Sequence, residues 1–192
     1  FIKLCEEHPQ VCAVMVEPIQ GEGGVHPLSK EFFEGVGQYA KDHDILLIVD
    51  EVQTGNGRTG KLYGYMNYDV EPDIVSTAKG IGGGLPLGVT MFNEKTENVY
   101  TPGTHGSTFG GNPIACAGAL SIMERIDDAL LKEVTAKGQY IKDEFTGAKG
   151  VKSVAGMGLM WGIEPEKDVK EIVPRLLAKG GVVLTAKETV RL

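Results

Sequence analysis

The sequence has few of the features that mark secreted, membrane-bound or metal-binding proteins. Among its 192 residues are only three cysteines, Cys5, Cys12 and Cys116. An odd number of cysteines without C-x-x-C spacing predicts neither a disulfide framework nor a zinc site. We therefore expect no metal centre, and we expect the three thiols to be small buried hydrophobic side chains.

Long apolar runs and an excess of basic residues are also missing. No run approaches the ~20 apolar residues of a membrane span, and the sequence does not begin with a charged segment followed by an apolar one. Acidic residues outnumber basic ones by 26 to 19, which gives a formal net charge of -7. Such a chain offers a nucleic-acid backbone little attraction. We expect a soluble, cytoplasmic protein that binds neither nucleic acid nor membrane.

Glycine is the residue in excess. The 27 glycines are concentrated in the runs GEGG, GNGRTG, KGIGGGLPLG and GSTFGGN, and their frequency is about twice the average. Several loops should therefore let the backbone approach another group closely. The chain begins at Phe1 without methionine and stops at Leu192 after a strand-like segment. We expect a piece of a longer protein that, alone, is poorly stable because of open sheet edges.

Apolar patterning up to about residue 128 predicts alternating strands and helices. Short links between strand, helix and strand are typical of a mainly parallel α/β sheet. Ser29 and Asn112 are well placed as helix caps. The expected strands are Val11–Val16, Ile45–Asp50, Asp73–Ala78 and Leu87–Asn93, and the expected helices are Ser29–Asp42 and Pro113–Ile126.

The pattern changes near Ala129 to that of a smaller α+β unit. We predict a large domain over residues 1–128 and a small, incomplete domain over residues 129–192. The small domain should contain a helix marked by Leu130, Val134, Ile141 and Phe145, a strand near Leu159–Glu164, a helix around Asp168–Lys179 and a strand at Val182–Thr185. Pro174 predicts that the second of these helices is kinked or begins late.

Two strands end on charged residues that should meet at one edge of the sheet. The apolar run Ile45–Val49, typical of a strand buried on both faces, stops at Asp50 and Glu51, and the next strand stops at Lys79, roughly one crossover unit later. Ligands bind at this edge of parallel sheets. A desolvated lysine among glycines is suited to form a Schiff base. An ion pair between Asp50 and Lys79 explains the spacing equally well, and Glu51 is expected to be structural.

The segment GNGRTG, Gly55–Gly60, matches the G-x-G-x-x-G pattern of dinucleotide-binding loops. Its context argues against that function. The segment begins several residues after the strand, the residues that follow it do not form a clean helical pattern, and Asp73 begins a strand where the motif requires an acid that ends one. We therefore do not predict dinucleotide binding.

Four motifs in a fixed order carry a resemblance to one enzyme family. They are EPIQGEGG (Glu17–Gly24), DEVQTGNGRTG (Asp50–Gly60), DIVSTAKGIGGGLPLG (Asp73–Gly88) and HGSTFGGNP (His105–Pro113). Together they resemble the class III aminotransferases, which use pyridoxal 5'-phosphate, over essentially all of the chain. The resemblance implies an α/β fold of the fold-type I transferases, in which residues 1–128 belong to the cofactor-binding domain and 129–192 to the small C-terminal domain.

The resemblance also implies roles for individual residues. Asp50 would pair with the protonated ring nitrogen of the cofactor, and Lys79 would carry the cofactor and shuttle a proton during transamination. Gln53 would donate a hydrogen bond to the phenolic oxygen of the cofactor. Ser107 and Thr108 would reach across a homodimer interface to the cofactor phosphate of the neighbouring subunit.

Glu22 and Arg191 are expected to bind substrate. In similar enzymes that act on ornithine-type substrates, a glutamate in this position pairs with an arginine near the end of the chain. The pair opens so that the arginine can bind a carboxylate of glutamate or 2-oxoglutarate, a task that suits its planar fork of donors. Glu17 and His105 are expected to be structural.

Within the family, the motifs favour transfer of the terminal amino group of N-acetylornithine to 2-oxoglutarate, which yields N-acetylglutamate semialdehyde and glutamate in arginine biosynthesis. Enzymes for ornithine, succinylornithine or 4-aminobutyrate share these motifs, and an aminomutase is a further alternative. A dimerisation module without cofactor would keep the fold. The presence of Asp50, Gln53 and Lys79 argues against it, because a scaffold needs none of the three.

Overall fold

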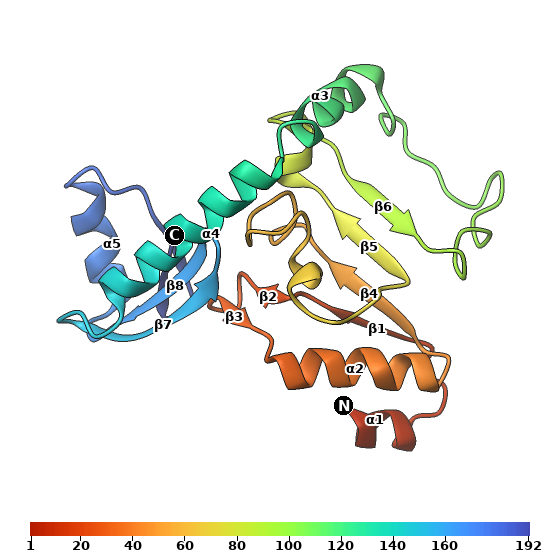
Figure 1. The fold of residues 1–192 in the computed structure, drawn as a ribbon, viewed down its shortest axis with the longest axis horizontal. Helices are drawn as coiled ribbons and strands as arrows, with labels where there is room; N and C mark the ends of the chain where they lie inside the picture. Colours follow the sequence, from red (N-terminus) through yellow and green to blue (C-terminus); the bar gives the residue numbers. More distant parts are fainter.

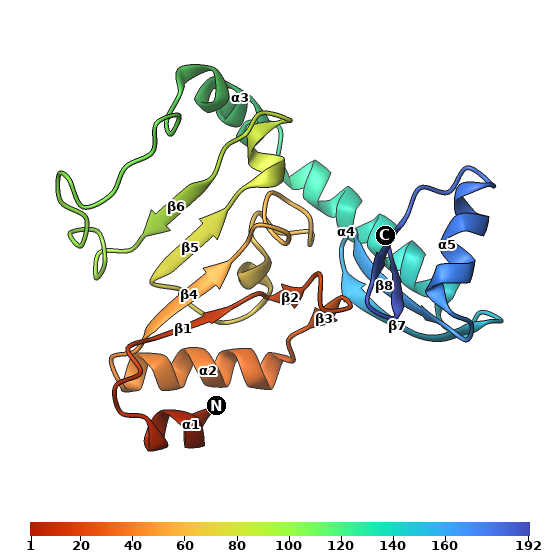
Figure 2. The same ribbon diagram turned by 180° about the vertical axis from the view of Figure 1, so that it is seen from behind.

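The computed structural model describes residues 1–192 and contains two four-stranded sheets joined by a long helix, together with one two-stranded sheet (Figures 1 and 2). The first sheet has the strand order β1-β4-β5-β6, the second has the order β7-β8-β10-β9, and β2 pairs with β3. The strands are β1 (Ala13–Val16), β2 (Ile19–Gln20), β3 (His26–Pro27), β4 (Leu46–Asp50), β5 (Ile74–Thr77), β6 (Val89–Phe92), β7 (Val151–Met157), β8 (Met160–Pro165), β9 (Leu184–Ala186) and β10 (Thr189–Arg191).

The first sheet confirms the prediction of mainly parallel strands. β1, β4 and β5 are parallel, whereas β6 runs antiparallel to β5 at one edge. In the register of β4 and β5, Asp50 lies opposite Ser76. Because the two strands run in the same direction, Asp50 and the residues that follow Thr77 lie at the same edge of the sheet.

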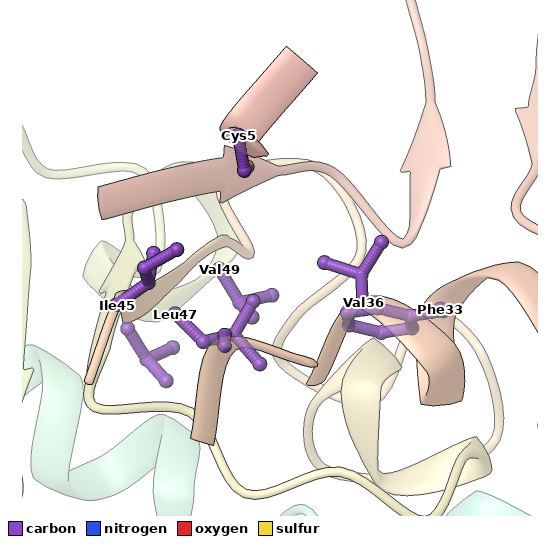
Figure 3. Packing of buried hydrophobic residues seen from close by; sticks show 8 residues of the cluster. Cys5, Phe33, Val36, Ile45, Leu47 and Val49 are labelled. Carbon is purple, nitrogen blue, oxygen red and sulfur yellow. The ribbon is translucent and has the colours of Figure 1, made fainter. Parts of the chain in front are cut away.

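The larger of two hydrophobic core clusters lies between this sheet and two helices, α1 (Ile2–Glu7) and α2 (Lys30–Asp42), and its packing is drawn in Figure 3. The hydroxyl of Ser29 caps α2 by accepting a hydrogen bond from the amide of Phe32 at 3.2 Å. The core consists of Cys5, Phe33, Val36, Ala40, Ile45, Leu47, Val49 and Val75. Each apolar group removed from water here contributes to stability in proportion to its buried area, at about 25 cal/mol per Å².

The expectation that β4 is buried on both faces is wrong. Leu47 and Val49 are fully buried, but Leu46 and Ile48 on the opposite face are only half-buried. The helices that contribute to the core, α1 and α2, pack on the face of Leu47 and Val49, which explains the difference.

The expectation for the thiols holds for one of the three. Cys5 of α1 is buried in the core, whereas Cys12 is exposed and Cys116 is half-buried. All three are free thiols, as the spacing predicts.

The remaining helices follow their predicted positions closely. They are α3 (Pro113–Met123), α4 (Asp128–Phe145) and α5 (Val169–Leu177), with the 3-10 turns η1 (Gly64–Asn67) and η2 (Lys79–Gly82). Asn112 caps α3 by accepting a hydrogen bond from the amide of Ala115 at 2.9 Å. No helix has the length and apolar character needed to cross a membrane.

Several details differ from the sequence-based prediction. The short elements α1, β2 and β3 and the strand β7 were not predicted. α5 does not begin late, since it starts directly after its Asp168 cap and contains Pro174 in its interior. The last predicted strand begins at Leu184 rather than at Val182. GNGRTG is followed by a bend and by η1, not by the helix of a dinucleotide-binding loop.

The second sheet packs against α4 and the loop after β4 through main-chain atoms. The turn between β7 and β8 contains Gly158, which packs against Gly138 of α4 on one side and against the loop at Arg58 and Thr59 on the other. A Cβ atom on either glycine would overlap main-chain atoms of its neighbour. The amide of Leu159 donates a hydrogen bond to the carbonyl of Arg58 at 2.9 Å. The predicted domain boundary between residues 128 and 129 falls at the start of α4 and remains a prediction.

Candidate active site

Lys79 is the second residue after the end of β5, at the edge of the sheet. It opens the 3-10 turn η2 directly after Ala78, and its side chain is exposed. Its φ of 50° lies in the left-handed region, which costs a non-glycine residue about 1–2 kcal/mol. Strain of this kind persists where surrounding contacts hold the backbone in place, and it is found preferentially at functional sites.

Asp50 ends β4 at the same edge and is half-buried. One carboxylate oxygen accepts a hydrogen bond from the amide of Val52 at 2.9 Å. None of the six ion pairs of the structure involves Asp50 or Lys79. The alternative in which these two residues simply neutralise each other is therefore wrong, and the sheet edge presents an amine and a carboxylate that are not paired with each other.

Glu51 is fully buried and has a structural role, as expected. Its carboxylate accepts hydrogen bonds from the hydroxyl of Thr54 at 2.6 Å and from the amides of Gly64 and Tyr65 at 2.8 and 2.7 Å. Burial raises the pKa of Glu51, while the three donated hydrogen bonds act in the opposite direction. The carboxylate thus binds Thr54 near the start of the loop that follows Asp50, and Gly64 and Tyr65 near its end, and so holds the two ends together.

Glu22, Gln53 and Arg191 form one hydrogen-bonded group. Nη1 of Arg191 donates to Oε1 of Glu22 at 2.7 Å and to Oε1 of Gln53 at 3.1 Å, and Nε2 of Gln53 lies 3.4 Å from the same glutamate oxygen. The guanidinium of Arg191 and the amide of Gln53 hold the pKa of Glu22 below its ordinary value. The pair of Glu22 and Arg191 that the resemblance implied is therefore present, and Gln53 is joined to it.

The second sheet brings Arg191 to this position. Arg191 is the last residue of β10, where it lies opposite Gly162 of β8. In the same strand, the hydroxyl of Thr189 donates a hydrogen bond to the carbonyl of Gly24 at 3.2 Å, next to Glu22. Only 17% of the Arg191 side chain is exposed, compared with 75% for Glu22, so the arginine is the more firmly held partner.

Two adjoining hollows surround Lys79. One, of about 260 Å³, is lined by Lys79, Asn56 and residues of α4, and the other, of about 450 Å³, by Lys79, Arg191 and the end of the chain. Gln53 and Arg58 line both. Three cationic side chains, Arg58, Lys79 and Arg191, line these hollows and can attract anionic ligands.

Ser107 and Thr108 lie elsewhere. They are exposed in the irregular segment between β6 and α3, and they line neither hollow. Phe109, next to them, is 83% exposed. Within one chain they therefore do not meet Lys79, and their predicted role towards a neighbouring subunit remains a prediction.

Of the two residues that are expected to be structural, Glu17 makes a hydrogen bond of that kind, whereas the exposed His105 makes a ring contact. A carboxylate oxygen of Glu17 accepts a hydrogen bond from the amide of Gly21 at 3.2 Å and shapes the turn that carries Glu22. The ring of His105 lies 4.6 Å, centre to centre, from that of Tyr100.

Sequence reasoning missed Asn56, which lies inside GNGRTG. Its side-chain amide donates hydrogen bonds to Thr77 and Ala78, directly before Lys79. The one signal in the sequence is an asparagine between two glycines, since asparagine tolerates the left-handed conformation that a tight loop requires.

Comparison with known proteins defines the family. The family described as Aminotransferase class-III matches residues 2–192. The acetylornithine aminotransferases of Haemophilus ducreyi and Caldanaerobacter subterraneus are 41% and 44% identical over 184 and 187 residues. These alignments cover 95% and 94% of this chain but 47% of each relative. The chain thus spans about half the length of the curated relatives it matches.

Solved structures agree in fold. Ornithine δ-aminotransferase of Plasmodium falciparum superimposes with a TM-score of 0.89 at 35% identity, over 100% of this chain and 53% of that one. N-acetylornithine aminotransferase of Stenotrophomonas maltophilia gives a TM-score of 0.87 at 32% identity, again over 100% and 53%.

The mainly parallel sheet with Asp50 and Lys79 at the carboxyl ends of its strands is that of the fold-type I pyridoxal-phosphate transferases. The chain belongs to the class III aminotransferase family. Members of this family are in general pyridoxal-phosphate-dependent transferases of amino-acid metabolism.

Proposed function

We propose that the chain provides the lysine-bearing part of a pyridoxal-phosphate-dependent aminotransferase that transfers the terminal amino group of N-acetylornithine to 2-oxoglutarate. The observation that supports this most strongly is the position of Lys79 and Asp50, an amine and a carboxylate that form no ion pair with each other at one sheet edge. Several relatives at 40% identity or above are named acetylornithine aminotransferases, which favours that substrate.

The residues present fit the cofactor. Lys79 is exposed and free of ion pairs, so its amine is available to bind an aldehyde carbon, and the carboxylate of Asp50 has no cation of the chain beside it. Gly21 lies so close to the amide of Gln53 that a Cβ atom would overlap it. This glycine therefore lets Gln53 lie beside Lys79, between the two hollows.

The chemistry divides between the cofactor and the chain. When bound, pyridoxal phosphate supplies an electron sink for the substrate carbon that loses a proton. The carboxylate of Asp50 would hold a proton on the ring nitrogen and so maintain that sink. The amine of Lys79 would hold the cofactor through its aldehyde carbon and, when free, would accept and return the proton of the substrate carbon.

Substrate binding is assigned to Arg191. Its guanidinium can bind a carboxylate of 2-oxoglutarate or glutamate through two hydrogen bonds once the pair with Glu22 opens. Because Glu22 is exposed and Arg191 is held by the second sheet, we expect the glutamate to be the partner that moves away.

We further propose a homodimer in which Ser107 and Thr108 contact the cofactor phosphate of the partner subunit. Monomeric proteins rarely expose many large apolar side chains close together. The segment around these two residues exposes Val99, Tyr100, Phe109, Ile114 and Leu120 by 53% to 83%. A buried interface would cover these side chains. A cytoplasmic location belongs to the same proposal.

Ornithine is the second candidate substrate, because ornithine aminotransferases are among the structures that superimpose well. A module that dimerises without cofactor is the alternative of another class. It predicts no selective chemistry at Lys79.

The test uses the protein expressed from its full-length gene. The protein is loaded with pyridoxal phosphate, reduced with borohydride and digested, and the adduct is located by peptide mass. We expect the adduct on Lys79 in the unsubstituted protein and in Lys61→Ala, a control at an exposed lysine of the loop after Gly60, and none in Lys79→Ala. Scattered adducts would refute cofactor binding. Faster formation of glutamate from 2-oxoglutarate with ornithine than with N-acetylornithine would refute N-acetylornithine as the substrate.

A further inference from the structure

Asn56 connects the loop after β4 with the end of β5. Its Nδ2 donates hydrogen bonds to the hydroxyl of Thr77 at 3.1 Å and to the carbonyl of Ala78 at 3.2 Å. Thr77 is the last residue of β5 and is 2% exposed. The two acceptors thus belong to the two residues that immediately precede Lys79.

The orientation of this amide follows from its partners. The carbonyl oxygen of Ala78 can only accept hydrogen bonds, so the atom that faces it must be the amide nitrogen of Asn56. Oδ1 of Asn56 is then left buried without a hydrogen-bond partner. A buried acceptor in this state costs about 1–3 kcal/mol. Asn56 also adopts a left-handed φ of 57°, which costs free energy in a residue other than glycine. The contact with β5 is therefore made in spite of two local energetic costs at Asn56.

The carbonyl of Ala78 holds the turn that contains Lys79. It also accepts a hydrogen bond from the amide of Ile81 at 3.3 Å, which closes the 3-10 turn around Lys79. Without the amide of Asn56, this carbonyl would keep one hydrogen bond, and the left-handed backbone of Lys79 could relax. Asn56 and Lys79 also line the same hollow.

We infer that Asn56 is a positioning residue for Lys79. The side-chain amide of Asn56 fixes the backbone from which the lysine reaches the cofactor. The inference rests on the proposed function of Lys79. Because a displacement of about 1 Å in a reacting group can lower a rate as much as a hundredfold, removal of this amide should slow the reaction of Lys79 without abolishing the fold.

Asn67 offers a matched control in the same loop. Its Nδ2 donates to the hydroxyl of Thr59 and to the carbonyl of Gly64, both at 3.0 Å. The variants Asn56→Gly and Asn67→Gly therefore each remove one amide that is bonded to a threonine hydroxyl and a main-chain carbonyl. Neither substitution adds a charge, and glycine retains the left-handed backbone at position 56.

The experiment measures two properties of the full-length, cofactor-free protein. The first is the rate at which Lys79 captures pyridoxal phosphate, followed by borohydride quenching and peptide mass. The second is hydrogen exchange of the amide of Ile81. We expect Asn56→Gly to slow capture about tenfold or more and to accelerate that exchange, while Asn67→Gly retains the rates of the unsubstituted protein.

The inference would be overturned if Asn56→Gly and Asn67→Gly had equal rates of cofactor capture at Lys79 and equal rates of hydrogen exchange at the amide of Ile81. If Asn56→Gly does not fold, Thr77→Val decides, because it keeps the volume of a buried side chain but removes the hydroxyl that accepts the Asn56 amide. Slower capture in Thr77→Val supports the inference and an unchanged rate refutes it. An unsubstituted protein that captures nothing at Lys79 refutes the proposed function, and Ile81 exchange then decides the positioning role separately.

Discussion

The contact between α4 and the turn of the second sheet gives a prediction in which two physical effects oppose each other. In an isolated helix, Gly138→Ala should stabilise by up to about 1 kcal/mol, because glycine loses more conformational freedom on folding than alanine does. Here the added Cβ atom would overlap the carbonyl of Gly158. Main-chain atoms on both sides leave no flexible side chain to move, so we expect overpacking to cost about 1–3 kcal/mol.

The net effect of Gly138→Ala is therefore expected to be a loss of about 1–2 kcal/mol. Gly35→Ala is the matched control, since Gly35 lies in the interior of α2 and nothing lies within 4 Å of the position that an added Cβ atom would occupy. That substitution should stabilise by about 0.5–1 kcal/mol. Both are measured as shifts in the denaturant midpoint of the full-length, cofactor-free protein.

The displaced turn should also affect the site. Gly158 adjoins Leu159, whose amide binds the loop at Arg58, and the same sheet carries Arg191 to Glu22. We expect Gly138→Ala to raise the KM for 2-oxoglutarate more than it slows cofactor capture by Lys79. If both glycine variants were equally stabilised, the close approach of α4 to the turn would be disproved.

Four further predictions concern buried and paired groups. Glu51→Ala removes the acceptor of three hydrogen bonds and should lower the free energy of unfolding by at least about 3 kcal/mol, which denaturant titration would detect. Because burial raises the pKa of Glu51 in the folded state, the contribution of Glu51 to stability should fall as pH rises above the ordinary value of 4.5. If the stability of Glu51→Gln fell with pH in the same way, Glu51 would not be the group responsible. The pKa of Glu22 is lowered, so the stabilisation from its pairing should be complete well above pH 4.5 and be lost as pH falls through the lowered pKa; in Arg191→Met, the NMR titration of Glu22 should move towards 4.5. Trp161→Phe removes the hydrogen bond from the indole to Gly158 and should cost about 1 kcal/mol, whereas an unchanged melting curve would mean that this bond contributes nothing.

Much of the fold could be predicted because its signals are local. Apolar runs marked β4 and β5, helical spacing behind Ser29 marked α2, and the rule that parallel strands end at one edge placed Asp50 and Lys79 together. These signals depend on residues only a few positions apart. The resemblance of the motifs supplied the pair of Glu22 and Arg191, which local patterning could not provide.

Other features were decided by the tertiary structure. The one-sided burial of β4, the link from Gln53 to Arg191 and the orphaned oxygen of Asn56 all depend on how segments far apart in the sequence meet. The sequence determined by itself which segments form strands and helices and which residues carry chemistry, because those properties follow from side-chain type and short-range spacing. Only the tertiary structure decided which of these residues touch, because the packing of the two sheets sets distances that no local pattern encodes.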